Sequence, residues 1–365
     1  MSHKYVLLKE VCEKASSNIA QKDLAECDGI YPIYGASGYI KSVDFFQQAK
    51  DYIAIVKDGA GIGRAMKLPA KSSVIGTMQY VLPKDNINIS YLYYAICSMH
   101  LEKYFSGATI PHIYFRDYQN EQLPLPTLEE QAKIANVFGK IDYFIKKEKE
   151  QLINLDKLVK SRFIEMFGDP ITNNKRWPAD KVEAVCSNIY GGGTPSKSKE
   201  EYWNGDIPWI SSKDMKSDMI SDSQIRITNL GLDNSSAKLV PMNSVIMVIR
   251  SGILKHTLPV AINTVPVTVN QDLKVFIPSA SIHYRFLAFL FKMLEKDILA
   301  GVRAVTADNI EFDTLKNRKI ILPPVQLQNQ FASFVTQVDK SKLAIQQSLD
   351  ELETLKKSLM QQYFG

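Results

Sequence analysis

Two segments of the chain carry apolar side chains alternately four and three residues apart. These segments are residues 125–168 and 322–365, and eight of ten positions of the repeat are apolar in each. A single long helix cannot bury such a stripe alone, and a repeat of 3.5 residues is typical of a coiled-coil seam. The predicted seam consists of Ile134, Phe138, Ile141, Ile145, Leu152, Leu155 and Val159 in the first segment, and of Phe331, Val335, Val338, Ile345, Leu349, Leu352 and Leu359 in the second.

The two segments are also copies of each other, because they align without a gap when 197 (322 minus 125) is added to each residue number. A duplication of this length indicates a repeated structural unit, so we expect the two helices to pair with each other, antiparallel. The alternative is two ordinary amphipathic helices, each packed on its own core. The residues of the first copy that recur identically in the second are Leu125, Pro126, Gln131, Ala135, Asp142, Leu152, Leu155, Leu158, Lys160, Ser161, Phe167 and Gly168.

Both segments carry local signals for the ends of a helix. Pro126 and Pro323 precede the expected first turns, and Thr127 with Glu130 has the spacing of a capping box. Gly168 stands where the end of a helix favours a left-handed residue. We therefore expect one continuous helix in each copy.

The remaining segments, residues 1–124 and 169–321, share an order of elements but few identities. Each combines short β-branched runs with glycine-rich turns, and one helix follows, at residues 91–104 and 284–299. The predicted fold class is α+β, with two α/β domains of strongly bent sheet joined by two long helices that form an antiparallel coiled coil with an internal pseudo-two-fold repeat. The predicted domains are residues 1–124 and 169–321, and the predicted helical regions are residues 125–168 and 322–365.

The two unlike segments can be matched at several points. The strand before Lys57 corresponds to the strand before Arg250, since each strand ends in a basic residue that is followed two positions later by glycine. Residues 78–79 correspond to residues 270–271, because each pair ends in glutamine ahead of an apolar run. We expect the matched positions to occupy equivalent places in the two domains.

The composition is that of a packed globular protein, with 45% hydrophobic and 23% charged residues among 365. The N-terminal residues contain no apolar core of signal-peptide length, and no apolar run approaches the roughly 20 residues that span a bilayer. We therefore expect a cytoplasmic protein. The net charge of +5 permits a nucleic-acid partner, since binding to a phosphate backbone depends on local clusters of lysine and arginine.

Two glycine-rich stretches resemble nucleotide-binding loops but lack their essential features. Residues 59–64 have the spacing GxGxG instead of GxGxxG, and no helical period follows them. In residues 191–198, Pro195 removes an amide donor from the loop that would have to surround a phosphate. We therefore expect no nucleotide at either loop.

Motifs for metal binding and catalysis are missing from the sequence as well. The four cysteines and five histidines show neither the spacing of zinc ligands nor an HExxH pattern. The Asn/Asp-Pro-Pro-aromatic tetrapeptide of DNA amino-methyltransferases is also absent. The sequence therefore predicts no metal, no cofactor and no catalytic residue, whereas a self-sufficient methyltransferase or nuclease would need such motifs.

The duplicated helices and the glycine-rich turns together resemble the specificity subunits of type I restriction–modification systems. Residues 125–131 (LPTLEEQ), followed by a long helix, resemble the central conserved region of that family, and residues 322–365 resemble its distal conserved region. Residues 31–38 (YPIYGASG) and 192–195 (GGTP) resemble parts of its target-recognition domains. The similarity covers essentially the whole chain.

The resemblance implies a non-catalytic subunit that recognises a bipartite site on double-stranded DNA, with one domain for each half-site. It also implies partners that perform the chemistry, namely two methyltransferase (modification) subunits and restriction subunits, which are ATP-dependent translocases and nucleases. A rigid rod of the 33 residues from Ile134 to Met166 would limit the half-site separation to roughly 50 Å, or roughly 15 base pairs. The alternative is a non-enzymatic coiled-coil scaffold whose two α+β domains bind protein partners.

Contacts with DNA bases and phosphates need basic, amide or hydroxyl side chains on exposed turns. The candidates are Tyr34, Ser37, Lys41, Lys57, Arg64, Thr77, Gln79 and His112 in the first domain, and Thr194, Lys197, Lys199, Ser212, Lys213, Arg250, Lys255, Asn270, Gln271 and Arg303 in the second.

Overall fold

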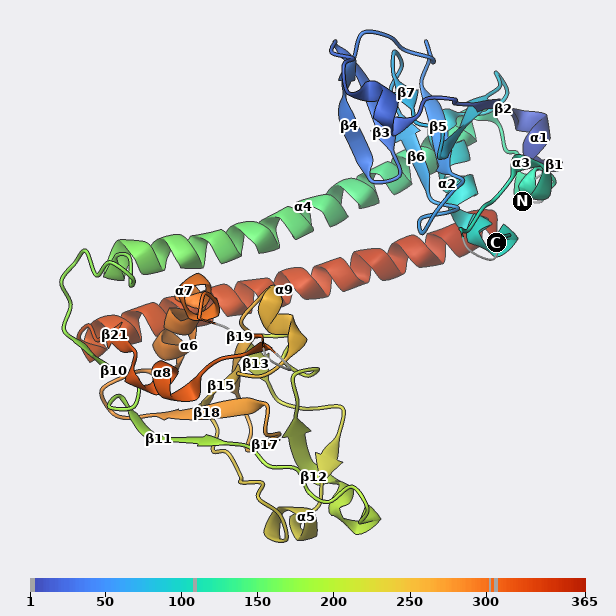
Figure 1. Cartoon of the computed structure of the whole chain (residues 1–365). Helices are drawn as coiled ribbons and strands as arrows, with labels where there is room; N and C mark the ends of the chain where they lie inside the picture. The colour runs from blue at the N-terminus through green and yellow to red at the C-terminus, as the bar shows by residue number, and fades with distance from the viewer. Residues whose placement is uncertain (1–3, 108–109, 302, 305–307) are drawn as a thin grey trace. The chain divides into compact units, whose positions relative to one another are not determined.

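The computed structural model describes residues 4–107, 110–301, 303–304 and 308–365. The chain divides into two compact units (Figure 1). Unit 1 contains Met1–Gln151 and Ala344–Gly365, and unit 2 contains Leu152–Leu343. Among the described residues, no helix combines the length and the hydropathy that crossing a bilayer requires.

Unit 1 contains a four-stranded sheet, a three-stranded sheet and a short strand pair. The four-stranded sheet is antiparallel with the order β2-β8-β5-β6, and the three-stranded sheet has the order β4-β3-β7, in which β3 and β7 are parallel. Helix α2 packs against β5 and β6. The elements are β1 (Tyr5–Leu7), α1 (Leu8–Val11), β2 (Cys12–Ser16), η1 (Gln21–Leu24), β3 (Tyr31–Gly35), β4 (Gly38–Val43), β5 (Tyr52–Val56), β6 (Ala65–Leu68), β7 (Ser73–Val74), β8 (Met78–Pro83), α2 (Ile89–Ser98), η2 (Leu101–Tyr104), α3 (Phe115–Tyr118) and β9 (Gln122–Pro124).

Unit 2 repeats this arrangement of strands and adds one strand, β13, parallel to β16 at the edge of the larger sheet. Its larger sheet has the order β11-β18-β15-β16-β13, and its smaller sheet has the order β14-β12-β17, in which β12 and β17 are parallel. Helix α6 packs against β15, β16 and β18. The elements are β10 (Ala179–Lys181), β11 (Cys186–Gly191), η3 (Glu200–Tyr202), β12 (Trp203–Ile210), β13 (Met219–Ile220), β14 (Arg226–Ile227), α5 (Asn229–Asp233), β15 (Val245–Val248), η4 (Gly252–Lys255), β16 (Val260–Asn263), β17 (Thr268–Val269), β18 (Leu273–Pro278), α6 (Tyr284–Met293), α7 (Glu295–Leu299), β19 (Arg303–Ala304), β20 (Asp308–Asn309), α8 (Phe312–Asn317) and β21 (Lys319–Ile321).

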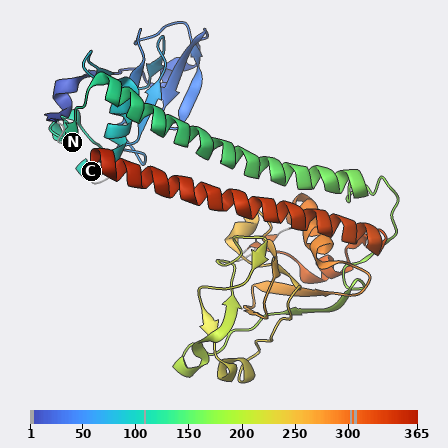
Figure 2. The ribbon, with the colours of Figure 1, turned by 180° about the vertical axis from the view of Figure 1, so that it is seen from behind.

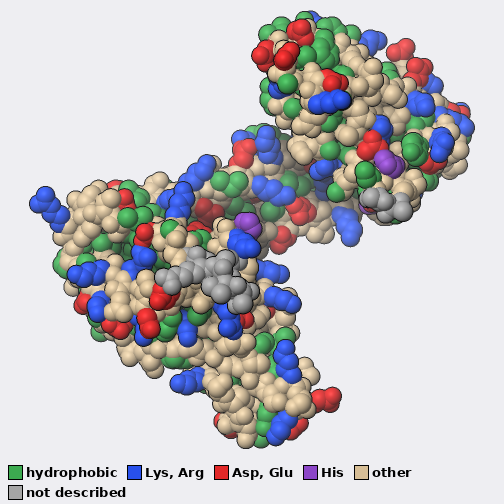
Figure 3. All heavy atoms as spheres, viewed as in Figure 1, with side chains coloured by type: hydrophobic (Ala, Val, Ile, Leu, Met, Phe, Trp, Pro, Cys, Tyr) green, Lys and Arg blue, Asp and Glu red, His purple; other side chains and the backbone are tan. Residues whose placement is uncertain are grey.

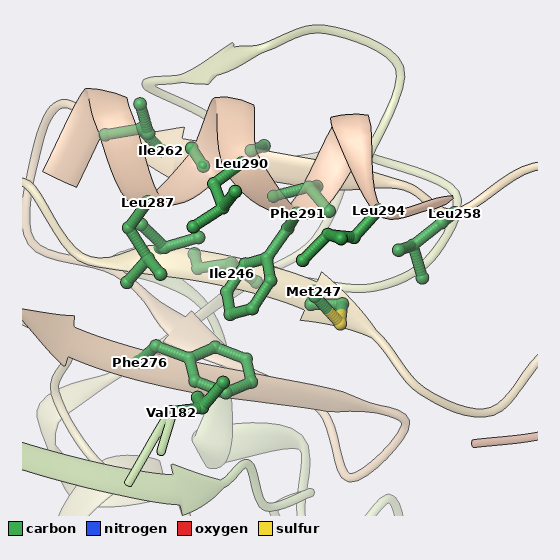
Figure 4. Close-up of a cluster of buried hydrophobic side chains, with 14 of the residues drawn as sticks. Val182, Ile246, Met247, Leu258, Ile262, Phe276, Leu287, Leu290, Phe291 and Leu294 are labelled. Atoms are coloured by element: carbon green, nitrogen blue, oxygen red, sulfur yellow. The ribbon is translucent and has the colours of Figure 1, made fainter. Parts of the chain in front are cut away.

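The core of unit 2 lies between α6 and the larger sheet (Figure 4). Leu287, Leu290 and Phe291 of α6 are fully buried, and so are Ile246 of β15 and Phe276 of β18. Burial of each such side chain stabilises the fold by about 1.5–3 kcal/mol. This packing gives the sheet of unit 2 a fixed helix on one face.

The helices predicted at residues 91–104 and 284–299 are each interrupted. In unit 1, α2 ends at Ser98, and the left-handed residue His100 (φ 52°) separates it from the short 3-10 helix η2. In unit 2, α6 ends at Met293 and α7 begins at Glu295. Apolar periodicity continues across both breaks, which explains why the sequence predicted single helices.

The two long helices, α4 (Leu128–Phe167) and α9 (Val325–Phe364), each contribute one stretch to each unit. The predicted capping box is present at the start of α4, where the Thr127 N–H donates to Glu130 Oε2 (3.0 Å) and the Glu130 N–H donates to Thr127 Oγ1 (3.3 Å). Gly168 (φ 76°) adopts the left-handed conformation directly after α4. The local signals in the sequence therefore predicted both ends of this helix correctly.

Within each unit, α4 and α9 lie side by side and run antiparallel (Figures 1 and 2). In unit 1, Asp142 accepts a hydrogen bond from Lys356 Nζ (2.6 Å), and Lys149 Nζ donates to Glu353 Oε1 (2.9 Å). Residue numbers thus rise along one helix while they fall along the other. In unit 2, Phe163 of α4 packs edge-on against Phe331 of α9, with ring centroids 5.5 Å apart. The predicted fold class, with its two paired helices, is confirmed.

The predicted seam positions all face the interior of their unit to some degree. Phe138 and Phe331 are fully buried, whereas Leu155 and Leu352, nearer the middle of each helix, are half-buried. The other buried members are Ile134, Ile141, Val159, Val338 and Leu349, and the other half-buried members are Ile145, Leu152, Val335, Ile345 and Leu359.

Candidate nucleic-acid interface

In unit 1, the loop that follows β5 is held against the segment that ends at His112. The carboxylate of Asp58 accepts a hydrogen bond from Lys57 Nζ (2.6 Å) and lies 2.6 Å from His112 Nδ1. The backbone adds a further link, because the Gly59 N–H donates to the Pro111 carbonyl oxygen (2.9 Å). Two of the candidate residues, Lys57 and His112, therefore share one acidic partner.

Arg64 joins this loop to the turn between β3 and β4. Its Nη2 donates to the carbonyl oxygen of Ala36 (2.8 Å), next to the exposed Ser37. Tyr34 is half-buried and packs edge-on against Tyr39, and burial raises the pKa of its hydroxyl. Tyr34 therefore remains a neutral hydrogen-bonding group at physiological pH.

Other candidates of unit 1 are engaged inside the unit. Gln79 does not lie on an exposed turn as expected, because it belongs to β8, is only 5% exposed and accepts a hydrogen bond from the Tyr118 hydroxyl (3.2 Å). Lys41 donates to Asp28 (2.9 Å) and to the Leu24 carbonyl oxygen (3.0 Å). These two side chains stabilise the unit through contacts within it.

In unit 2, Arg250 is the second residue after β15 and pairs with an acidic side chain. Its Nε and Nη2 lie 2.7 and 2.6 Å from Asp272 Oδ1. Asn270 donates from Nδ2 to the other carboxylate oxygen (3.2 Å) and is itself only 7% exposed. Asn270 therefore fixes Asp272, which in turn fixes the plane of an exposed guanidinium group.

The GGTP segment of unit 2 is pressed against the backbone of β17. A Cβ atom on Gly192 would lie 2.0 Å from the carbonyl oxygen of Val269, so no larger residue fits there. Thr194 donates from its hydroxyl to Gln271 Oε1, which links this segment to the turn that contains Asn270. A close backbone contact with β17 therefore explains the glycine at position 192.

The remaining candidates of both units lie in loops or short elements. Lys199 is exposed, and its Nζ donates to the Tyr202 hydroxyl (3.1 Å). Arg303 belongs to β19, and its side chain lies outside the described residues. The other exposed members are Thr77, Lys197, Lys213 and Lys255, and the half-buried member is Ser212.

Backbone hydrogen bonds correct the predicted match between the two units. The Thr77 carbonyl oxygen accepts the N–H groups of Lys57 (3.0 Å) and Asp58 (3.3 Å). The Asp272 carbonyl oxygen likewise accepts the N–H groups of the first two residues after β15, at 2.9 Å and, for Arg250, at 3.3 Å. Arg250 therefore occupies the place of Asp58, and the prediction that it matches Lys57 was wrong by one position.

The predicted match of residues 78–79 with residues 270–271 was wrong by three positions. Since Thr77 and Asp272 make the same bonds, β8 and β18 begin at equivalent residues, Met78 and Leu273. Similar residue types had suggested the alignment, whereas cross-strand hydrogen bonds determine the actual register.

The sequence prediction missed the acidic residues of these clusters. Asp58 and Asp272 organise the basic candidates of the two units, and the only signal for them was their closeness in sequence to Lys57 and Asn270. Two buried glutamines, Gln131 and Gln328, were not among the candidates either, although they are identical in the two copies of the long helix.

Charges of both signs occur on the surface. On the face shown in Figure 3, lysine and arginine side chains lie among aspartate and glutamate side chains. Within the described part of the chain, no group of three or more His, Cys, Asp or Glu residues is arranged to hold a metal ion.

The sequence of the chain matches one family model over two regions. The model is that of the type I restriction modification DNA specificity domain, and it covers residues 3–156 and 175–354. The chain therefore belongs to the type I restriction–modification specificity family, as the resemblance indicated.

Individual relatives agree with this assignment. The chain is 29% identical over 269 residues to the type I restriction enzyme EcoR124I/EcoR124II specificity subunit of Escherichia coli, a match that covers 72% of this chain and 66% of the relative. It is 25% identical over 304 residues to the MjaIX specificity subunit of Methanocaldococcus jannaschii, which covers 77% and 69%. The chain thus spans about two thirds of the length of these relatives.

A solved structure shares the fold. The crystal structure of the type I restriction–modification S subunit from M. genitalium aligns with a TM-score of 0.67 at 16% sequence identity, covering 100% of this chain and 96% of that one. At this identity the similarity concerns the fold alone.

Proposed function

We propose that the chain is the DNA sequence-specificity subunit of a type I restriction–modification enzyme and that it performs no catalysis itself. Residues 1–124 and 169–321 are assigned as its two target-recognition domains, each binding one half of a bipartite site on double-stranded DNA. The main observation that supports this proposal is that the two units share one arrangement of strands and place different side chains at equivalent loop positions. Asp58 stands at this position in unit 1 and Arg250 in unit 2.

The exposed members of the candidate set supply the proposed DNA contacts. Arg250 is held in a fixed plane by Asp272, and a fixed guanidinium group suits bidentate recognition of guanine in the major groove. Arg64, between two loops of unit 1, and the exposed lysines of unit 2 suit contacts with phosphates. Gln79 and Asn270 are not assigned to DNA, because both are buried within their units.

The proposed protein partners are two methyltransferase subunits, with restriction subunits joining them. Most residues that are identical in the two long helices are buried or half-buried, so packing explains their recurrence. Leu158, Lys160 and Ser161 are exposed, however, and so are their three copies 197 residues later. Identical exposed side chains at two equivalent positions suit two copies of one partner, one on each helix.

The stoichiometry of the complex tests this docking surface. We expect Leu158→Asp and Leu355→Asp each to reduce the bound methyltransferase from two copies to one, and the double variant to bind none, measured by native mass spectrometry. Ile153→Asp and Leu343→Asp are matched controls, because these side chains are 55% and 61% exposed on the same helices and are not repeated. Two bound copies in both single variants would contradict the assignment.

The assignment as a whole is tested with DNA. The chain and its methyltransferase are purified together, and methylated adenines are mapped on random DNA. A bipartite consensus with an unspecified spacer is the expected outcome. Absence of any DNA sequence preference, together with stable binding of a protein partner, would indicate the scaffold instead.

A further inference from the structure

Gln131 joins the first turn of α4 to the start of α2 in unit 1. Its side chain is fully buried. The Asn88 N–H donates to Gln131 Oε1 (2.7 Å), while Gln131 Nε2 donates to the carbonyl oxygens of Pro126 (2.9 Å) and Asn86 (3.4 Å). Asn88 is the N-cap of α2, so a single amide ties the beginning of the domain helix to the beginning of the long helix.

Gln328 makes the same set of contacts in unit 2. It is also fully buried. The His283 N–H donates to Gln328 Oε1 (2.8 Å), while Gln328 Nε2 donates to the carbonyl oxygens of Pro323 (2.8 Å) and Ser281 (3.2 Å). His283 is the N-cap of α6, as Asn88 is of α2. The tie is therefore repeated although the capping residues differ.

A second tie follows eleven residues later on each long helix (142 minus 131, and 339 minus 328). In unit 1, Tyr94 of α2 donates from its hydroxyl to Asp142 Oδ2 (2.9 Å). Burial raises the pKa of Tyr94, so its hydroxyl stays protonated and able to donate. In unit 2, Arg285 of α6 donates from Nη1 to Asp339 Oδ2 (2.5 Å). Both aspartates are identical in the two copies, and both bind the domain helix of their own unit.

We propose that these four residues, Gln131, Asp142, Gln328 and Asp339, are positioning residues that set the angle between each recognition domain and its long helix, and so the spacer length that the enzyme accepts. The inference rests on the proposed function. A single contact would allow the domain to rotate about it. Two contacts about 16 Å apart along a helix fix the orientation of the domain relative to that helix. These hydrogen bonds join helices and do not involve the candidate loops. We therefore expect them to affect the spacer length that the enzyme accepts and not the half-site sequences that it recognises.

The test uses the full chain in complex with its methyltransferase subunits. Methylation rates are measured on DNA that carries both half-sites with spacers from two base pairs shorter to two base pairs longer than the preferred one. In Gln131→Met and Gln328→Met, which keep the side-chain volume and remove its hydrogen bonds, we expect the preference for the correct spacer to fall roughly tenfold. Gln151→Met and Gln330→Met, at exposed glutamines of the same helices, should keep the wild-type preference.

A conservative pair of variants separates positioning from stability. Asp142→Asn and Asp142→Leu both remove the ion pair with Lys356, but only Asn can still accept from the Tyr94 hydroxyl. Asp142→Asn should therefore retain the spacer preference and Asp142→Leu should lose it. The proposal is overturned if the glutamine variants lose activity equally at every spacer, or if they keep the wild-type ratio. If the glutamine variants do not fold, the spacer preference of the two Asp142 variants decides between the outcomes. A wild-type complex that needs no second half-site would instead contradict the proposed function.

Discussion

The position after β5 in unit 1 and the position after β15 in unit 2 have the same backbone environment and opposite charge. Asp58 stands at the first, where it pairs with Lys57 and lies 2.6 Å from His112 Nδ1. Arg250 stands at the second and is neutralised by Asp272. In both units the carbonyl oxygen of the residue just before the neighbouring strand accepts the N–H groups of two successive residues, which fixes the loop.

This difference shows which parts of the two units are constrained. The strand arrangement is held by hydrogen bonds between backbone groups. The contacts between each domain helix and its long helix are made by residues that are identical in both copies, such as Gln131 and Gln328. The side chains at the loop positions can then change sign without loss of the fold, provided that each brings its own counter-charge. Two loop surfaces of different chemistry can thus be built on one arrangement of strands.

The largest expected effect, on the free energy of unfolding, comes from disrupting the seam between α4 and α9, which is present in both units. Leu155→Asp and Leu352→Asp each place a carboxylate in the seam between α4 and α9, where both leucines are half-buried and Leu155 packs against the apolar core of unit 2. We expect each to lower the free energy of unfolding by about 3 kcal/mol. Leu158→Asp is the matched control, because that side chain is 48% exposed on the same helix, and it should change stability by less than about 0.5 kcal/mol. Chemical denaturation followed by circular dichroism measures both, and equal stability of the three variants would argue against the seam.

A smaller and more selective effect is expected where the units differ. Arg250→Ala removes the fixed guanidinium group of unit 2, and we expect discrimination at one base pair of one half-site to fall by about 1–3 kcal/mol. Asp58→Asn is the counterpart at the equivalent position and should alter only the other half-site. Mapping of methylated adenines gives both results. If either substitution changed both half-sites, the two units would not recognise DNA independently.

The sequence predicted the helix pairing well because a repeat of 3.5 residues is a local property of the chain. It did not predict that Arg250 matches Asp58, since that match depends on cross-strand bonds to Thr77 and Asp272. Gln79 was assigned to an exposed turn for a related reason. Its burial arises from Tyr118, a residue of α3 that is distant in sequence, and no local pattern encodes this contact.

The smallest predicted effect concerns the capping residues, Asn88 in unit 1 and His283 in unit 2. His283 accepts the Arg285 N–H through Nδ1 (3.1 Å), which requires that nitrogen to be unprotonated. Burial, and secondarily the nearby Arg285 charge, lowers the pKa of His283. The unfolded chain, with a histidine pKa of about 6.5, therefore binds this proton more readily than the folded chain does.

The contribution of the His283 cap is thus fully present above about pH 6.5 and is lost as the pH falls through the lower pKa of the folded state. We expect His283→Asn, which copies the cap of unit 1, to match the wild type in thermal midpoint at pH 7.5. At pH 5 the variant should be more stable by about 1 kcal/mol or less, because asparagine has no charge to gain. The reciprocal change, Asn88→His, should introduce the same acid sensitivity into unit 1. If His283→Asn and the wild type lose stability in parallel between pH 7.5 and 5, the acid sensitivity lies elsewhere and the two caps are equivalent.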